Sequence, residues 1–117
     1  MMDTLNYLSF HGIILYNRES DGCLNGIYTN NNINGLIFNE IARRTAGVDN
    51  SIQGDYVCSY IDNGNVLHGA TLTITEINPT LNRTYKFLWK DAKSQPIFEG
   101  IGFIMNKKQI AVYYKKA

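Results

Sequence analysis

Thr84-Tyr85-Lys86-Phe87-Leu88-Trp89-Lys90 is the stretch of this 117-residue chain that decides its fold class. Aromatic side chains occupy every second position of the stretch, and threonine and lysine take most of the positions between them. Successive side chains of a β-strand point to opposite faces, so this period of two is typical of a strand with one buried face and one face in water. Tyr56, Cys58 and Tyr60 repeat the pattern earlier in the chain. The sequence therefore predicts a β protein.

Turn-forming residues divide the rest of the chain into short segments of similar length. Asn30-Asn31-Asn32 and Asn78-Pro79-Thr80 are two of these breaks. Because the connections are short, consecutive strands should pair as antiparallel neighbours. The segments between the breaks predict about eight strands, near 7–16, 22–30, 33–43, 52–62, 66–78, 82–91, 96–106 and 109–116.

One segment fits two kinds of element. Residues 35–46 have the composition of a strand, and they also fit a short helix that Asn34 would cap and Gly47 would stop. A helix there would leave a smaller barrel, or a sheet wrapped around one helix. Both readings remain open from the sequence.

A short glycine pattern recurs along the chain. Glycine is unfavourable inside a strand, and sheets accept it where a strand bends sharply or where a bulky neighbour crosses close to the backbone. A sheet that closes into a barrel needs such bends at intervals. We therefore predict an all-β, antiparallel up-and-down β-barrel. An apolar residue, a polar residue and glycine follow one another at 10–12, 24–26, 33–35, 52–54, 67–69 and 98–100.

Composition and charge limit the classes of protein to which this chain can belong. The chain is 44% hydrophobic and 18% charged, which is typical of one globular domain spanning residues 1–117. Its formal net charge of +1 provides no basic field for nucleic acid. The apolar run 13–15 is too short for a signal peptide or a membrane span. We expect a cytoplasmic protein without nucleic-acid or membrane partners, and the sequence is also compatible with an exported form whose leader has been removed.

Cysteine and histidine give no metal-binding pattern. Cys23 and Cys58 are far apart in sequence and belong to no C-x-x-C pair, so we expect free thiols, with a disulfide between them as the alternative. His11 and His68 each precede a glycine of the recurring pattern, and two histidines without a third ligand do not make a zinc site. We therefore expect no metal and no cofactor.

Motifs of catalysis are also missing from the sequence. It contains no G-x-S-x-G elbow, no phosphate-binding loop and no dinucleotide fingerprint. Glu40 or Glu99 would act as a general acid or base only if its strand turned it inward, and most strand carboxylates point outward. A Cys58–His68 dyad depends on a spatial proximity that the sequence does not reveal. We expect a protein that is not an enzyme.

Several motifs from residue 23 onward resemble the avidin and streptavidin branch of the calycin barrels. Cys23-Leu24-Asn25-Gly26-Ile27-Tyr28-Thr29-Asn30 is similar to the first strand of that family, where an aromatic residue precedes Thr-Asn. Ile52-Gln53-Gly54-Asp55-Tyr56 is similar to its Gly-x-Tyr strand. The motifs at 67–69, 85–90 and 98–100 then follow in the order of the family.

This resemblance, which spans residues 23–116, implies a calycin-like barrel related in shape to the lipocalins, with a ligand pocket at one mouth. By motif position it places Asn30, Tyr56 and Trp89 near that pocket. The chain departs from the family at Cys58, where a threonine is expected, and in its last strand, which has no tryptophan. The serine and threonine residues with which biotin binders hold their ligand are also missing from the aligned positions. The resemblance therefore implies a binding barrel whose ligand is not biotin.

The aromatic content suggests what such a barrel does. Eight tyrosines, five phenylalanines and one tryptophan exceed the needs of a core of this size, and tyrosine suits a semi-polar pocket or an interface. We expect a non-catalytic protein that binds a small molecule in a pocket lined by Asn30, Tyr56, Tyr85 and Trp89, at the end holding the asparagine-rich loop.

The alternative function is a protein–protein interaction or inhibitor module. In that case side chains would fill the barrel, and its outer face or loops would bind the partner. The strand faces, including the adjacent Tyr113 and Tyr114, would also suit a homo-oligomer interface.

Overall fold

The computed structural model describes residues 9–47, 50–62, 64–78 and 84–117, which form eight strands and no helix. Hence no described segment is a helix long and apolar enough to cross a membrane. The predicted strands at 7–16 and 82–91 each begin at residues outside the described ranges. The strands are β1 (His11–Arg18), β2 (Leu24–Asn30), β3 (Phe38–Gly47), β4 (Gly54–Ile61), β5 (Leu67–Glu76), β6 (Thr84–Lys90), β7 (Pro96–Ile104) and β8 (Gln109–Lys116).

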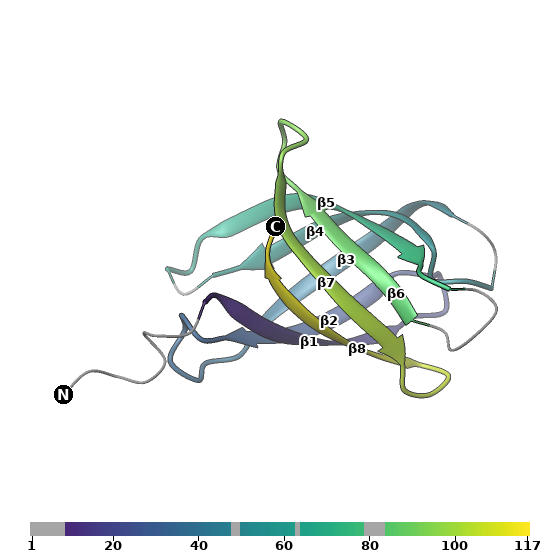
Figure 1. Cartoon of the computed structure of the whole chain (residues 1–117), viewed down its shortest axis with the longest axis horizontal. Coiled ribbons are helices and arrows are strands. Elements are labelled where there is room, and N and C mark those ends of the chain that lie inside the picture. The colour runs from purple at the N-terminus through teal and green to yellow at the C-terminus, as the bar shows by residue number, and fades with distance from the viewer. Residues whose placement is uncertain (1–8, 48–49, 63, 79–83) are drawn as a thin grey trace.

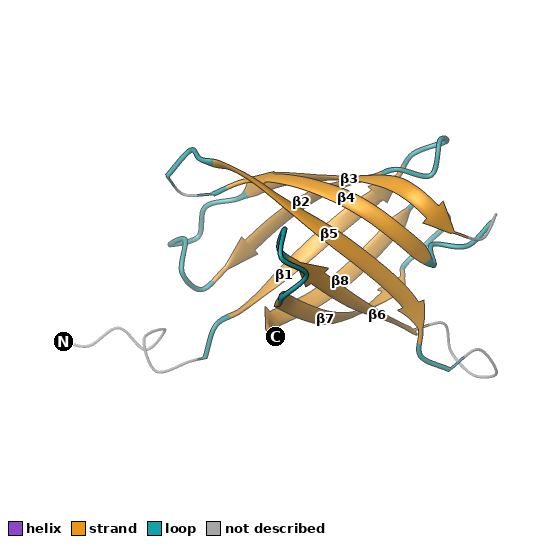
Figure 2. Cartoon of the chain, turned by 90° about the horizontal axis from the view of Figure 1, so that it is seen from above, coloured by secondary structure: helices purple, strands orange, loops and turns teal. Residues whose placement is uncertain are grey.

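The strands form one closed antiparallel barrel. Each strand pairs with the next in sequence, and β8 pairs with β1 to complete the ring. Ile14, for example, lies opposite Tyr28 on β2 and opposite Val112 on β8. Figure 1 shows β8, in yellow, beside β1, in purple, and Figure 2 shows the same tilted strands with their connections at the two ends. The predicted all-β, up-and-down barrel is confirmed.

The segment with two sequence readings is a strand. β3 covers Phe38–Gly47, so the helix alternative for 35–46 is wrong. The predicted start of this strand at residue 33 is also wrong. Asn34 and Gly35 have φ angles of 53° and 78°, a left-handed conformation that continues neither a strand nor a right-handed helix. These two residues hold the chain in a turn, and pairing with β2 begins only at Phe38.

One end of the barrel is sealed by the residues that lead into β4. Ile52 is completely buried there, and the hydroxyl of Tyr56 donates a 2.7 Å hydrogen bond to its carbonyl oxygen. The Arg44 guanidinium donates to the carbonyl oxygens of Ser51 and Gln53, at 2.8 Å each. Buried guanidinium groups need such acceptors, so these contacts fasten the segment over the barrel. We call this end the closed end.

The recurring glycines do not share one structural role. Gly35 lies in a turn with positive φ, whereas Gly69 lies on β5 with its position exposed to solvent. Gly12 and Gly26 instead lie on the inner face, each under an aromatic ring. The prediction of a closed sheet from the glycine pattern is therefore correct. The individual glycines, however, have different roles: one forms a turn, one lies on the exposed face of a strand, and two lie under aromatic rings.

Candidate ligand-binding site

A cavity of about 350 Å³ opens at the other end of the barrel, where β2, β4 and β6 finish. We call this end the mouth. A volume of this size lies within the range of pockets for small molecules, which is roughly 300–1,000 Å³. Most of its walls are aromatic. The lining residues are Phe10, Ile14, Tyr28, Asn30, Asn32, Ile33, Glu40, Tyr60, Asp62, His68, Trp89, Phe98 and Tyr114.

The lining includes a buried carboxyl group, that of Glu40. Alternation along β3 turns Glu40 and Ala42 inward while Ile41 points outward, and Glu40 is only 5% exposed. Removal from water disfavours the charged form, so burial raises the pKa of Glu40 to about 7. The Tyr16 hydroxyl and the Trp89 indole lower that pKa in part, because both favour the carboxylate. Glu40 is thus poised between its neutral and charged forms at physiological pH.

A glycine lets Tyr16 reach Glu40. In the barrel register Tyr16 is opposite Gly26, and Gly26 is opposite Glu40 on the next strand. The Tyr16 ring lies over Gly26, where a Cβ atom would come within 2.7 Å of the ring carbon Cδ1. Its hydroxyl donates a hydrogen bond to Glu40 Oε2. The bare backbone of Gly26 is therefore what lets a tyrosine on β1 bond to a carboxylate on β3.

The same arrangement occurs a second time at the rim. Tyr114 on β8 is opposite Gly12 on β1, and Gly12 is opposite Asn30 on β2. A Cβ atom on Gly12 would lie 2.5 Å from the Tyr114 ring. Asn30 Nδ2 donates a 3.0 Å hydrogen bond to the Tyr114 hydroxyl. Each tyrosine thus crosses a glycine to reach a polar side chain two strands away.

Trp89 brings an unsatisfied donor to the cavity. Its indole Nε1 is the one buried side-chain polar atom without a hydrogen-bond partner among the described residues. The indole lies close enough to Glu40 to lower the carboxyl pKa, yet it completes no hydrogen bond. Its ring centroid is 5.9 Å from that of Phe87 and 6.0 Å from that of Tyr114. A buried N–H left unpaired costs roughly 1–3 kcal/mol, so the indole favours any acceptor that comes within reach.

The outer rim of the cavity carries a hydrogen-bonded histidine–aspartate pair. His68 Nε2 lies 2.5 Å from Asp62 Oδ2, and this hydrogen bond is the main cause that lowers the pKa of Asp62. The His68 ring stacks on Tyr60 at 5.2 Å, and Tyr60 meets Tyr28 edge to face at 6.2 Å. The Asp62–His68 pair therefore fixes one aromatic wall of the mouth.

The phenol groups of the cavity stay neutral at physiological pH. Burial raises the pKa of Tyr114 to about 12, and it also raises the pKa values of Tyr28 and Tyr60. The hydroxyl of Tyr28 donates a hydrogen bond to the Ile61 carbonyl oxygen. These groups supply ring faces and hydroxyl groups without charge.

Two of the four predicted site residues meet in this cavity. Asn30 and Trp89 line it, whereas Tyr56 and Tyr85 lie near the closed end. Tyr85 and Trp89 share the inner face of β6, but four residues separate them by about 13 Å along a strand. The alternation of the sequence predicts which side chains share a face of a strand. The depth of each side chain along the barrel axis depends instead on the register and tilt of the strands.

Other cavity residues were missed or assigned differently from sequence. Glu40 points inward, against the expectation for most strand carboxylates, while Glu99 lies at the surface 3.6 Å from Lys115. Tyr60 shares the strand and face of Tyr56 but lies at the mouth.

Cys58 and Cys23 are free thiols, and burial raises the pKa of Cys58 so that its thiolate is disfavoured.

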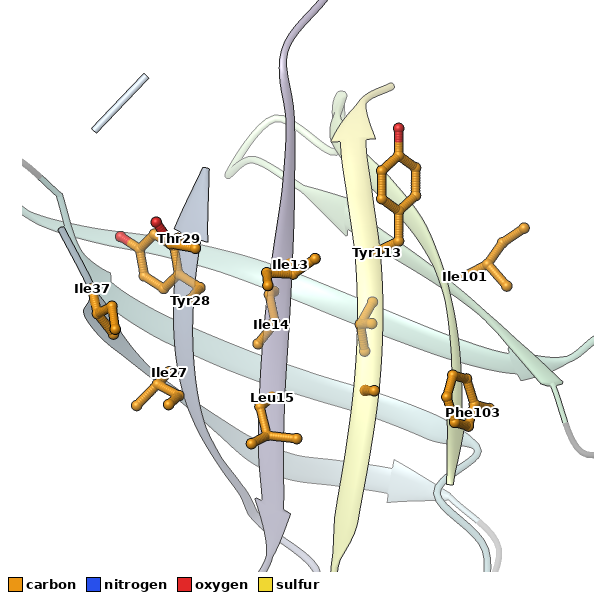
Figure 3. A pocket seen from close by; sticks show the side chains of 12 residues that line it. Ile13, Ile14, Leu15, Ile27, Tyr28, Thr29, Ile37, Ile101, Phe103 and Tyr113 are labelled. Carbon is orange, nitrogen blue, oxygen red and sulfur yellow. The ribbon is translucent and has the colours of Figure 1, made fainter. Parts of the chain in front are cut away.

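A second feature lies on the outside of the barrel, across β7, β8, β1 and β2. Figure 3 shows its lining side chains, most of which are apolar. The hollow that they border has a volume of about 500 Å³. Tyr113 is part of this face, whereas Tyr114 points into the barrel, so the two adjacent tyrosines do not share a surface. We call it the outer apolar face. One cross-strand row holds Ile101, Tyr113, Ile13 and Thr29, and the next holds Phe103, Ala111, Leu15 and Ile27.

Fold and cavity together define the class of protein, a closed eight-stranded antiparallel barrel with an aromatic pocket at one mouth. Within the described part of the chain, no three His, Cys, Asp or Glu side chains are grouped as a metal site would require. No family model matches this chain, and neither a curated protein nor a solved structure does.

Proposed function

We propose that the protein is a non-catalytic binding protein that holds a small molecule in the mouth of its barrel. One observation carries the proposal: a buried carboxyl group, that of Glu40, lines an open cavity together with aromatic side chains that include Trp89. Glu40 accepts a hydrogen bond from the Tyr16 hydroxyl, and a carboxylate can accept more than one such bond, so this group favours a ligand that donates to it. Apolar walls with a few polar groups are typical of small-molecule pockets.

Two further points support this function over a filled barrel. The cavity volume of about 350 Å³ leaves room for a ligand that an interaction module with a filled interior would not need. The sequence resemblance to the avidin and streptavidin branch of the calycin barrels also favours a ligand held at one mouth. That resemblance implies Asn30, Tyr56 and Trp89 at the pocket; Asn30 and Trp89 line the cavity, and Tyr56 does not.

Trp89 provides the test, because it is the only tryptophan and it lines the cavity. We expect some members of a panel of small aromatic, heterocyclic and aliphatic amphiphiles to change its emission in a saturable way. Phe98→Leu, at the cavity, should weaken that binding. Phe103→Leu is the matched control, because it makes the same change on the outer surface of the same strand. A panel that leaves the emission unchanged, or two variants that behave alike, would contradict the proposal.

Self-association is a second candidate, favoured by the outer apolar face. Its two rows contain no charged side chain, and Phe103 is 52% exposed. Contiguous apolar surface of this kind marks interaction sites. A second copy of the chain is the occupant we propose, because a two-fold interface sets the same patch against itself and an uncharged patch does so without repulsion.

A further inference from the structure

The charges around the cavity are unbalanced toward acid. Among the described residues its lining contains two carboxylates, those of Glu40 and Asp62, and no lysine or arginine. His68 pairs with Asp62 at the rim, so Asp62 already has a partner. The Lys116 ammonium lies outside, 5.6 Å from the centre of the Phe10 ring. Glu40 is therefore a buried acid that faces the cavity without a cationic partner among the described residues.

The groups that face Glu40 from the surrounding strands are donors or neutral side chains. Tyr16 on β1 donates to it, Trp89 on β6 lies beside it, and Tyr60 is opposite it on β4. Tyr28, Cys58 and Tyr114 lie close enough for Glu40 to raise their pKa values, and burial raises those pKa values further. All of these titratable neighbours are neutral at physiological pH. A charge on Glu40 thus has hydrogen-bond support, and no counter-ion from the part of the chain that the structure describes.

The aromatic walls add a second preference. Tyr28, Tyr60, Trp89 and Tyr114 border the same space as the Glu40 carboxyl group. Ring faces attract cations, and the attraction is stronger where water is excluded. A carboxylate beneath aromatic rings is therefore suited to a positively charged nitrogen attached to an apolar body.

We infer that the ligand class is a small organic cation, an amine with an apolar body, and that Glu40 is its counter-ion in the pocket. The inference rests on the proposed function and narrows it to one ligand chemistry. The ammonium group would donate to the Glu40 carboxylate, which also accepts the hydrogen bond from the Tyr16 hydroxyl. A neutral ligand that donates one N–H or O–H group is the competing class, and the test below distinguishes the two.

The inference predicts that binding of an amine depends on pH, because Glu40 must release its proton. At acidic pH Glu40 holds a proton that must leave before the carboxylate can pair with a cation. We therefore expect the affinity for an amine to rise by up to about tenfold per pH unit below pH 7 and to level off above it. A neutral ligand of the same shape should show no such rise.

The probes are 2-phenylethylamine, which is cationic across this range, and 2-phenylethanol, which replaces the ammonium with a hydroxyl. Binding is measured by Trp89 emission between about pH 5 and about pH 8. The amine should bind more tightly than the alcohol at the upper limit, by about tenfold or more, and should lose this advantage at the lower limit.

Glu40→Gln should abolish both the advantage and the pH dependence, because glutamine keeps an acceptor for Tyr16 without a charge. Alcohol binding to this variant reports whether the pocket is intact. His68→Gln is the control for the other side-chain type that titrates in this range, and it should leave the pH dependence in place.

Three outcomes would overturn the inference. The first is equal binding of the alcohol and the amine at every pH. The second is a Glu40→Gln variant that retains the pH dependence. The third is a panel in which neither probe binds while other members do. In each of these cases the proposed binding function stands and only the ligand class fails. If no member of the wider panel binds, the proposed function fails together with the inference.

Discussion

Tyr16 and Glu40 lie on strands that are not neighbours, and they are joined by a hydrogen bond that passes over Gly26. The tyrosine ring occupies the space that any side chain at position 26 would need. The bond holds the carboxyl group of the candidate site in place from β1. Gly26, which has no side chain, is therefore required for the geometry of the site.

Gly26→Ala should destabilise the barrel. The new methyl group would meet the Tyr16 ring at 2.7 Å, so the ring must move and its bond to Glu40 must weaken. Overpacking of this kind costs about 1–3 kcal/mol, measured as the free energy of unfolding in urea. Gly69→Ala is the control, because a methyl group there meets only the Cys58 carbonyl oxygen, at 3.9 Å. Equal losses in the two variants would show that ring crowding is not the cause.

The stability of the protein should fall as the pH rises from about 5 to about 7. Glu40 holds its proton more tightly in the folded chain, where its pKa is about 7, than in the unfolded chain, where 4.5 is the ordinary value. The folded state therefore binds more protons between these pKa values, and its stability is lost as the pH rises through that window. The loss should be about 3 kcal/mol for a fully developed shift.

Glu40→Gln isolates this effect, because it removes the titrating group and keeps the bond from Tyr16. Urea unfolding of the variant should show a flatter pH profile, with greater stability than the original chain at about pH 8. Asp21 and Asp62 have lowered pKa values and act only at more acidic pH. Parallel profiles for the two proteins would contradict the raised pKa of Glu40.

Tyr114→Phe should cost about 1 kcal/mol of stability, because Asn30 loses the hydroxyl to which it donates at 3.0 Å. Tyr113→Phe is the neighbouring control, since the Tyr113 side chain lies on the outside and is 51% exposed. Thermal or urea unfolding of both variants measures the difference. A Tyr113 variant that loses as much stability would refute the assignment of the two tyrosines to opposite faces.

Phe103→Glu should weaken self-association if the outer apolar face joins two copies of the chain. It places two like charges near each other across a two-fold interface and removes apolar contact area. Sedimentation equilibrium of both proteins over a range of concentrations gives the dissociation constants. A chain that is monomeric throughout that range removes the second candidate function and leaves the ligand pocket unaffected.

The two thiols should react at different rates in the folded protein. Cys23 is partly exposed, whereas Cys58 is completely buried and its raised pKa disfavours the thiolate. A thiol-reactive disulfide reagent should therefore modify Cys23 first and reach Cys58 only on unfolding. Cys23→Ser should remove the fast phase. A fast phase that survives this change would place the reactive thiol at Cys58.

Much of the fold could be predicted because strand patterns are local. The last strand, predicted at 109–116, has those bounds in the structure. The third strand was predicted less well, since Asn34 and Gly35 turn the chain where the apolar sequence favoured an earlier start. Local composition indicates which elements form, whereas the residue at which pairing begins depends on the partner strand.

The sequence by itself determined that this chain is a closed ribbon of strands with aromatic residues on its inner face. Alternation and turn residues act over a few positions, and they suffice for that result. Only the tertiary structure decided that Glu40, Trp89 and Tyr114 share one cavity while Tyr56 and Tyr85 lie near the closed end. The physical reason is that contacts across a barrel depend on the register and tilt of non-neighbouring strands, which no short stretch of sequence encodes.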